Sequence, residues 1–156
     1  LASLLGWRVI VVDRREALLA LDRFPGAAGL VRTDFPEAAK RVPTDERTYV
    51  LIMTHNYVHD RDLLRAFLPT EAAYLGMLGP RARTEKILRE LQEEGVALDA
   101  ARRVRIFGPV GLDVGSETPD EIAVAVLGEI LAVARGRGGG FLRARAGPIH
   151  APPQDA

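Results

Sequence analysis

Short runs of consecutive apolar residues recur along the chain, separated by stretches in which apolar residues lie three or four positions apart. A run of apolar residues without alternation is typical of a strand buried on both faces of a parallel sheet. The amphipathic stretches predict helices that pack one face against such a sheet. Strands are predicted over Val9–Val12, Gly29–Val31, Tyr49–Met53, Ala73–Leu78 and Val104–Phe107. Helical segments are predicted over Glu16–Arg23, Phe35–Arg41, Asp60–Leu68, Thr84–Glu94 and Thr118–Arg135.

Residues at the ends of these segments agree with the pattern. Gly6 suits the C-terminal cap of an apolar turn, and Asp60 suits the N-cap of the helix that it begins. Thr118 and Glu121 have the spacing of a capping box at the start of the longest helix. Helices and strands that alternate in this way predict an α/β fold with a doubly wound, mainly parallel sheet of the Rossmann-like type.

The composition changes near residue 135. Residues 1–135 are predicted to form one Rossmann-like domain, and a chain of 156 residues is long enough for one domain with a sizeable core. Residues 136–156 are rich in Gly, Arg and Pro, and are predicted to form a flexible tail that folds back only in part.

Charge and cysteine content exclude several classes of function. Lys plus Arg and Asp plus Glu both number 21, so nothing in the charge balance calls for a nucleic-acid partner. The chain has no cysteine, which excludes disulfides, thiolate metal sites and a cysteine nucleophile and fits a reducing, cytoplasmic compartment. No apolar run approaches the roughly 20 residues that a membrane-spanning helix needs.

Candidate chemistry lies where the predicted strands end, because ligands of open α/β sheets bind outside the carboxyl ends of the strands. Asp13 directly follows a buried strand, and an acid in this place of a dinucleotide fold accepts hydrogen bonds from ribose hydroxyls. The alternative is a polar residue that ends the strand. Thr54 and His55 follow the next strong strand, and His55 is either a ligand-facing residue or an ordinary loop histidine.

A metal site built from His55, His59 and Asp60 is a further alternative, but no further ligand at helical spacing completes the pattern. We therefore predict no metal site. Gly79 precedes Arg81 and Arg83 at the start of a helix, where two guanidinium groups suit an anion. A solvated helix face is the alternative for both arginines.

A turn-rich loop precedes the last helix. Its residues Gly111 and Gly115 allow a close approach of the backbone to a ligand, and Asp113 argues against a bare phosphate cradle. No P-loop and no serine–histidine–aspartate order is present, so the residues favour ligand carriage over catalysis.

A glycine-rich loop of the dinucleotide-binding type is expected roughly 20 residues before Asp13, which is upstream of Leu1. We therefore expect the sheet of this chain to lack its first, central strand and that loop. An open interior edge invites pairing, so a strand from elsewhere or a homodimer is also expected.

Four segments together resemble a known family. They are the residues 5–15, 53–55, 74–84 and, above all, 109–123, with the sequence PVGLDVGSETPDEIA. The chain resembles the C-terminal Rossmann domain of XdhC/CoxI-type xanthine dehydrogenase accessory proteins. This resemblance implies binding of the molybdenum cofactor (molybdopterin) and a chaperone role in its sulfuration and insertion. It implies a xanthine dehydrogenase-type molybdoenzyme as partner and a cysteine desulfurase as a further one. An NAD(P)-binding domain of an oxidoreductase stays open as the alternative.

Overall fold

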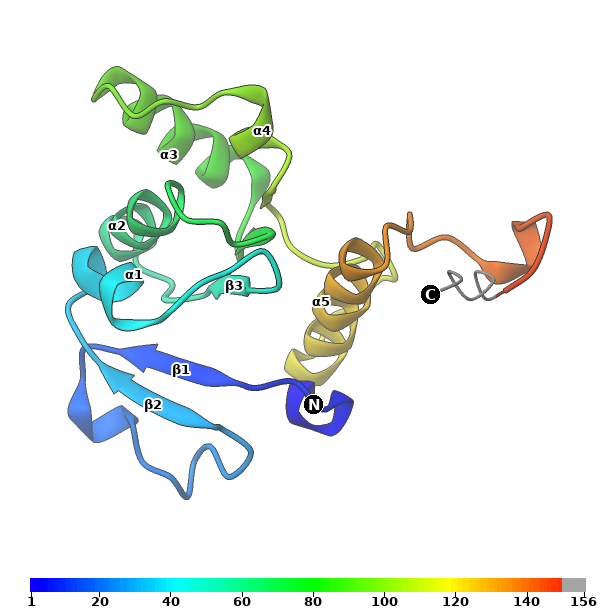
Figure 1. Cartoon of the computed structure of the whole chain (residues 1–156), viewed down its shortest axis with the longest axis horizontal. Coiled ribbons are helices and arrows are strands. Elements are labelled where there is room, and N and C mark those ends of the chain that lie inside the picture. Colours follow the sequence, from blue (N-terminus) through cyan, green and yellow to red (C-terminus); the bar gives the residue numbers. More distant parts are fainter. Residues whose placement is uncertain (150–156) are drawn as a thin grey trace, which may run out of the picture.

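The strands of the computed structural model, which describes residues 1–149, form two separate parallel sheets. Strand β1 pairs with β2, and the second sheet has the order β3-β4-β5, with parallel pairing throughout. Within residues 1–149, no strand lies between β1 and β3 (Figure 1). The Rossmann-like α/β class is confirmed, and so is the expected interruption of its sheet. The strands are β1 (Ile10–Asp13), β2 (Gly29–Arg32), β3 (Tyr49–Ile52), β4 (Tyr74–Met77) and β5 (Ile106–Phe107).

Helices cover both faces of the second sheet. The helices α2 and α3 pack on one face and α5 on the other (Figure 1). The α-helices are α1 (Ala38–Arg41), α2 (Tyr57–Phe67), α3 (Arg81–Glu93), α4 (Ala100–Arg103) and α5 (Pro119–Ala134). Short 3-10 helices are η1 (Ala2–Leu5), η2 (Glu16–Leu18), η3 (Phe35–Glu37) and η4 (Leu142–Ala144). Among the described residues, no helix is long and apolar enough to cross a membrane.

The four side-chain positions of β4 are all buried, as the unbroken apolar run predicts. Leu75 and Met77 belong to the larger core cluster, with the apolar faces of α2 and α3. Tyr74 belongs to the smaller cluster, with Val126 and Ile130 of α5. Alternate residues of one strand therefore fill two different cores, which is the three-layer arrangement expected of this fold class.

Side chains, not backbone hydrogen bonds, connect the two sheets. The rings of Trp7 and Tyr49 stack with their centroids 5.7 Å apart, just before β1 and at the start of β3. Val12 of β1 packs against the larger core, which also contains Ile52 of β3. All four residues of β1 nevertheless stay only half-buried, unlike those of β4.

The segment between β1 and β2 differs from its prediction. Only the 3-10 turn η2 forms where a helix over Glu16–Arg23 was expected, and Leu21 is exposed. A Cβ built on Gly26 would lie 2.4 Å from the Ser3 hydroxyl oxygen, so this loop closes tightly against η1. A stretch of this length is too short to stay helical without tertiary packing, which exposed Leu21 does not provide.

Two helices begin three residues before their predicted starts. Asn56, and not Asp60, is the N-cap of α2, because its side chain accepts a hydrogen bond from the His59 N–H. The prediction of Asp60 as a cap was wrong, since the Asp60 side chain is buried in the protein interior. The capping box of α5, from Thr118 and Glu121, is confirmed.

Gly76 lets the loop after β5 pack across β4. A Cβ at this position would lie 2.5 Å from Tyr74 Cε1 and 2.7 Å from Val110 Cγ1. Since Tyr74 is fully buried, its ring has no free space into which to move.

We therefore expect Gly76→Ala to lower the free energy of unfolding by about 1–3 kcal/mol through overpacking. Urea denaturation measures this loss. Gly138→Ala is the matched control, because nothing lies within 4 Å of a Cβ built there, and its effect should stay within about 0.5 kcal/mol. Equal effects of the two substitutions would contradict the packing argument.

Candidate functional site

The carboxyl ends of the parallel strands carry the predicted site residues, at the edge where ligands of such sheets bind. Thr54 and His55 follow β3, and Gly79 follows its neighbour β4. Asp13 is the last residue of the parallel strand β1, as predicted. Among the described residues, however, β1 has β2 as its one strand neighbour, so it is not central within residues 1–149.

A buried carboxylate connects the ends of β3 and β4. Asp60 is 0% exposed. Its Oδ1 accepts hydrogen bonds from the Thr54 backbone N–H at 3.2 Å and from the Thr54 hydroxyl at 2.5 Å. Its Oδ2 accepts a hydrogen bond from Arg83 Nη2 at 2.6 Å. The structure thus brings together Thr54 and Arg83, which lie in two different segments of the sequence.

The backbone of His55 has an uncommon conformation. Its φ angle of 59° makes it the one non-glycine residue with positive φ in residues 1–149. Hydrogen bonds on both sides hold this turn: Thr54 Oγ1 accepts from the Asn56 N–H, and Asn56 Oδ1 accepts from the His59 N–H. The His55 side chain is left exposed at the strand edge. A conformation that costs free energy and is held by its neighbours suggests a functional role.

Arg81 and Arg83 both begin α3, but they lie in different surroundings. Exposed Arg81 pairs with Glu85 at 2.6 Å and lines an open hollow of about 330 Å³ together with Arg103 and Gly108. The Arg83 side chain is 21% exposed, and its Nε is buried without a hydrogen-bond partner. An anion at the strand edge would therefore meet the exposed part of the Arg83 side chain and not Nε.

Glycines shape the loops on either side of α3. Gly79 has φ of 132°, and a Cβ there would lie 3.6 Å from Arg83 Cδ. Gly111 and Gly115 have φ of 107° and 72° in the loop before α5, where Asp113 is exposed. These positive values need glycine, as the sequence predicts for a loop of close backbone approach.

Glu129 of α5 holds that loop in place through a hydrogen bond. The sequence analysis did not identify Glu129 as a site residue. One of its oxygens, Oε2, accepts hydrogen bonds from the Gly111 N–H at 3.1 Å and from the Tyr74 hydroxyl at 2.5 Å. Burial raises the pKa of Tyr74, so its hydroxyl stays protonated and donates. A tyrosine in an otherwise apolar strand was the available signal, since a buried hydroxyl needs a partner.

Asp13 is engaged by its own neighbour. Arg15 forms a fork on the carboxylate, with Nε on Oδ1 at 3.0 Å and Nη2 on Oδ2 at 2.9 Å, and the Arg15 backbone N–H also donates to Oδ1. The hydrogen-bonded guanidinium holds the pKa of Asp13 below its usual value. A ribose hydroxyl would share the carboxylate with Arg15.

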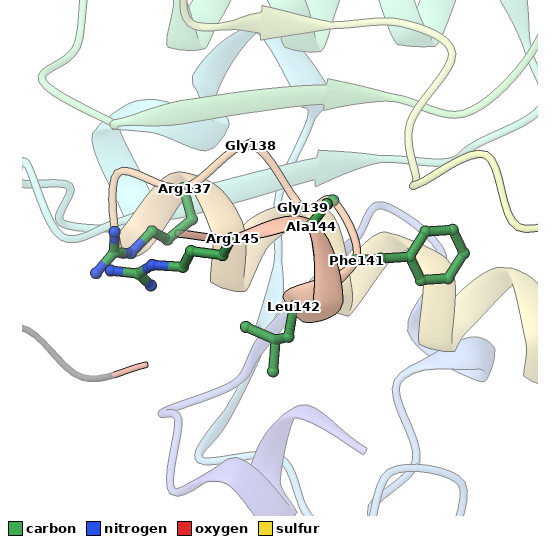
Figure 2. Close-up of a pocket in the computed structure, with 8 residues that line it drawn as sticks. Arg137, Gly138, Gly139, Phe141, Leu142, Ala144 and Arg145 are labelled. Atoms are coloured by element: carbon green, nitrogen blue, oxygen red, sulfur yellow. The ribbon is translucent and has the colours of Figure 1, made fainter. Parts of the chain in front are cut away.

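A second open hollow, of about 300 Å³, lies within the segment after α5. Figure 2 shows Phe141 pointing away from Arg137 and Arg145. This hollow contains none of the predicted site residues. The segment after α5 packs against the loop before α5 at Gly139, where a Cβ would lie 2.6 Å from Leu112 Cδ2. Residues 150–156 of the predicted tail lie outside the described residues.

Within residues 1–149, no three His, Asp or Glu side chains gather as a metal site would require.

A family model described as the XdhC Rossmann domain matches residues 1–130. The chain belongs to this family. The resemblance noted in the sequence is thereby confirmed, and the match spans every described strand and the larger part of α5.

Relatives of this XdhC domain are much longer than the chain. It is 36% identical over 142 residues to the uncharacterized protein YqeB of Escherichia coli, covering 90% of the chain and 26% of that protein. It is 33% identical over 135 residues to a protein of Bacillus subtilis named as a probable xanthine dehydrogenase subunit, covering 84% of the chain and 37% of that protein. The crystal structure of a xanthine dehydrogenase from Bacillus halodurans matches with a TM-score of 0.73 and 29% identity, over 86% of the chain and 39% of that structure. The chain thus spans between about a quarter and two fifths of each of these relatives.

Removing the buried carboxylate of this XdhC domain should destabilise it. We expect Asp60→Ala to cost about 3 kcal/mol of unfolding free energy, because Arg83 would lose its ion-pair partner and Thr54 its acceptor. Asp62→Ala, on the same helix, should cost about 0.5 kcal/mol or less. Urea denaturation of both variants tests the difference. A loss for Asp60→Ala no larger than that of its control would show that the network adds little.

The ion pair of Asp13 should appear in its titration. We expect Arg15→Ala to raise the pKa of Asp13 toward its ordinary value, as followed by NMR of the carboxyl carbon, whereas Arg14→Ala should leave it low. Since folding lowers this pKa, the pair stabilises the fold above the pKa of the unfolded carboxyl, about 3.9, and the contribution disappears as the pH falls through the folded pKa. An unchanged Asp13 titration in Arg15→Ala would contradict this assignment.

Proposed function

We propose that this domain binds the molybdenum cofactor and acts as an accessory chaperone in the maturation of a xanthine dehydrogenase-type molybdoenzyme. The observation that carries the proposal is its membership of the XdhC family. The Bacillus subtilis relative and the Bacillus halodurans structure, both named after xanthine dehydrogenase, support the same enzyme system.

The strand edge fits an anionic, ring-bearing group of this kind. Molybdopterin combines a phosphate with a pterin ring that carries hydrogen-bond donors and acceptors. The guanidinium of Arg83, whose side chain is 21% exposed at the strand edge, suits the phosphate. The carboxylate of Asp13 and the exposed His55 suit the ring. When bound, the cofactor would supply molybdenum chemistry to its target enzyme, and these residues would hold and orient it.

The arrangement of side chains supports carriage over catalysis. The Thr54 hydroxyl donates to Asp60, whose other oxygen is occupied by Arg83. In residues 1–149, no hydrogen bond links the His55 side chain to a nucleophile or a carboxylate. A general base needs such a connection, or one through substrate, to take a proton from a reacting group.

The proposal extends to partners and compartment. The molybdoenzyme would receive the cofactor, and a cysteine desulfurase would supply the sulfur for its sulfuration. We also propose a homodimer, because β1 and β3 each have one edge without a strand neighbour among the described residues. A cytoplasmic location agrees with a chain free of cysteine.

The position of Asp13 supports a second candidate, an NAD(P)-binding domain of an oxidoreductase. An acid at the end of this strand is the residue that binds ribose hydroxyls in dinucleotide folds. The fork of Arg15 on both carboxylate oxygens would compete with ribose hydroxyls and with a pterin ring alike, so the contacts of Asp13 do not separate the two candidates.

Arg83 and Arg81 form a matched pair for testing the proposal. We expect Arg83→Gln to weaken binding of molybdopterin by about 1.5–3 kcal/mol, because a charged donor is removed from the strand edge. Arg81→Gln should change binding by less than about 0.5 kcal/mol, since Arg81 pairs with Glu85. Isothermal calorimetry with the whole protein measures both, and circular dichroism confirms that each variant is folded.

The same titration with NADH and NADPH separates the two candidate functions. Tight nicotinamide binding followed by hydride transfer to a small carbonyl compound would replace the carrier function with the oxidoreductase one. A loss below about 0.5 kcal/mol in Arg83→Gln would remove Arg83 from the proposed site.

A further inference from the structure

Helix α5 is apolar on two opposite sides, although only one of them belongs to a core. Its inner side packs in the smaller core cluster through Val126 and Ile130. On its outer side, Leu127 and Leu131 are half-exposed and lie outside both core clusters of residues 1–149, and Val124 is 60% exposed. A helix with apolar residues on more than its core face is expected to be covered on that side too.

The outer apolar residues have the spacing of a helix–helix contact. Val124, Leu127, Leu131 and Ala134 follow one another at intervals of three, four and three residues. Intervals of three and four place side chains in one stripe along a helix, and they are the a/d pattern through which two helices interlock their side chains. We call these four residues the outer seam of α5.

The segment after α5 does not cover the outer seam. It packs at Gly139 against Leu112, on the neighbouring side of the helix where Leu112 also contacts Gly128. Beyond this point it runs away from the sheets (Figure 1). Phe141 and Leu142 are exposed there. The seam and the segment that follows it therefore both present apolar side chains outside the domain.

Opposite charges lie at the two ends of the seam. Residues 106–123 contain no Lys or Arg, and their acids are Asp113, Glu117, Asp120 and Glu121. Residues 135–149 contain no Asp or Glu, and their bases are Arg135, Arg137, Arg143 and Arg145. Within the described part of the chain, none of these charged side chains is in an ion pair. Each end of the seam thus lacks a partner of opposite charge.

We infer that α5 of a second copy of this chain packs antiparallel on the outer seam. An antiparallel arrangement sets the acidic start of each helix beside the basic end of the other, whereas a parallel one would bring like charges together. The surface is therefore complementary to itself, and two copies related by a two-fold axis close into a dimer.

The seam fixes the register of the two helices. Leu127 of one copy meets Leu131 of the other, and Val124 meets the smaller Ala134. Asp120 then lies about one helical turn from Arg135 of the second copy, within reach of its long side chain. Two-fold symmetry repeats each contact, so an ion pair stands at both ends of the leucines.

Charge reversal tests this pairing in the 156-residue chain. Asp120→Arg and Arg135→Asp each place like charges opposite one another at both ends of the dimer. We expect either change to weaken dimerisation by about tenfold or more, as measured by sedimentation equilibrium. Leu131→Gln, at the centre of the seam, should weaken it by about tenfold as well.

The double variant separates pairing between copies from stability of the helix. Asp120→Arg with Arg135→Asp restores opposite charges across the interface, so the dissociation constant of the dimer should return to within about threefold of that of the unchanged chain. Both changes oppose the dipole of α5, so an effect exerted only through helix stability would make the double variant the weakest dimer. Circular dichroism confirms that each variant is folded.

Glu93→Arg is the matched control, because Glu93 is an exposed acid of α3 away from the seam, and its dimer should be unchanged. A chain that stays monomeric at about 1 mM would overturn the inference and assign the seam to a different polypeptide. A dimer that ignores the single reversals would also overturn it, in favour of pairing through the edges of β1 or β3. So would a double variant that does not recover. The pairing needs no cofactor, so these outcomes leave the proposed function untouched.

Discussion

Strand β4 lies between two parallel neighbours, and each of its side chains is buried in a core shared with a helix. Burial on both faces demands apolar residues, close packing and satisfied backbone groups together. Gly76 provides the space for Val110, and Tyr74 is buried only because Glu129 accepts from its hydroxyl. Arg105 donates to the carbonyls of Leu68, Thr70 and Ala72 at the turn that leads into this strand. The contacts that enclose β4 therefore also fix the loops that carry the candidate site.

The same requirement explains why the β1–β2 sheet is less well buried. Its strands pair with each other and meet the rest of the domain through Trp7, Val12 and the segment around Phe35. Contacts between side chains bury apolar area but satisfy no backbone groups, so they cannot replace a strand. The candidate site is affected directly, because Asp13 belongs to one sheet and Thr54 to the other. Their separation depends on what joins the two sheets.

Local patterns predicted the strands and the capping box of α5 because the apolar runs and the spacing of Thr118 and Glu121 act over a few residues. They could not predict the role of Asp60. From the sequence alone, an aspartate at this position can equally be a helix N-cap or a partner in a buried ion pair. The choice depends on Arg83, 23 residues away, which the fold brings within 2.6 Å. Glu129 was missed for the same reason, since its partners Tyr74 and Gly111 lie 55 and 18 residues away. The helix expected over Glu16–Arg23 did not form, because so short a stretch needs tertiary packing to stay helical and its Leu21 is exposed.

Burial of Asp60 also bears on how a ligand would be held. A carboxylate removed from water is retained only if charged and polar partners surround it, and here Thr54 and Arg83 supply them. The guanidinium of Arg83 is thereby fixed by one of its nitrogens while Nε stays without a partner. A fixed guanidinium loses less conformational entropy on binding an anion than a free one does. Rigid orientation of this donor agrees with the proposed role of the domain in holding a cofactor.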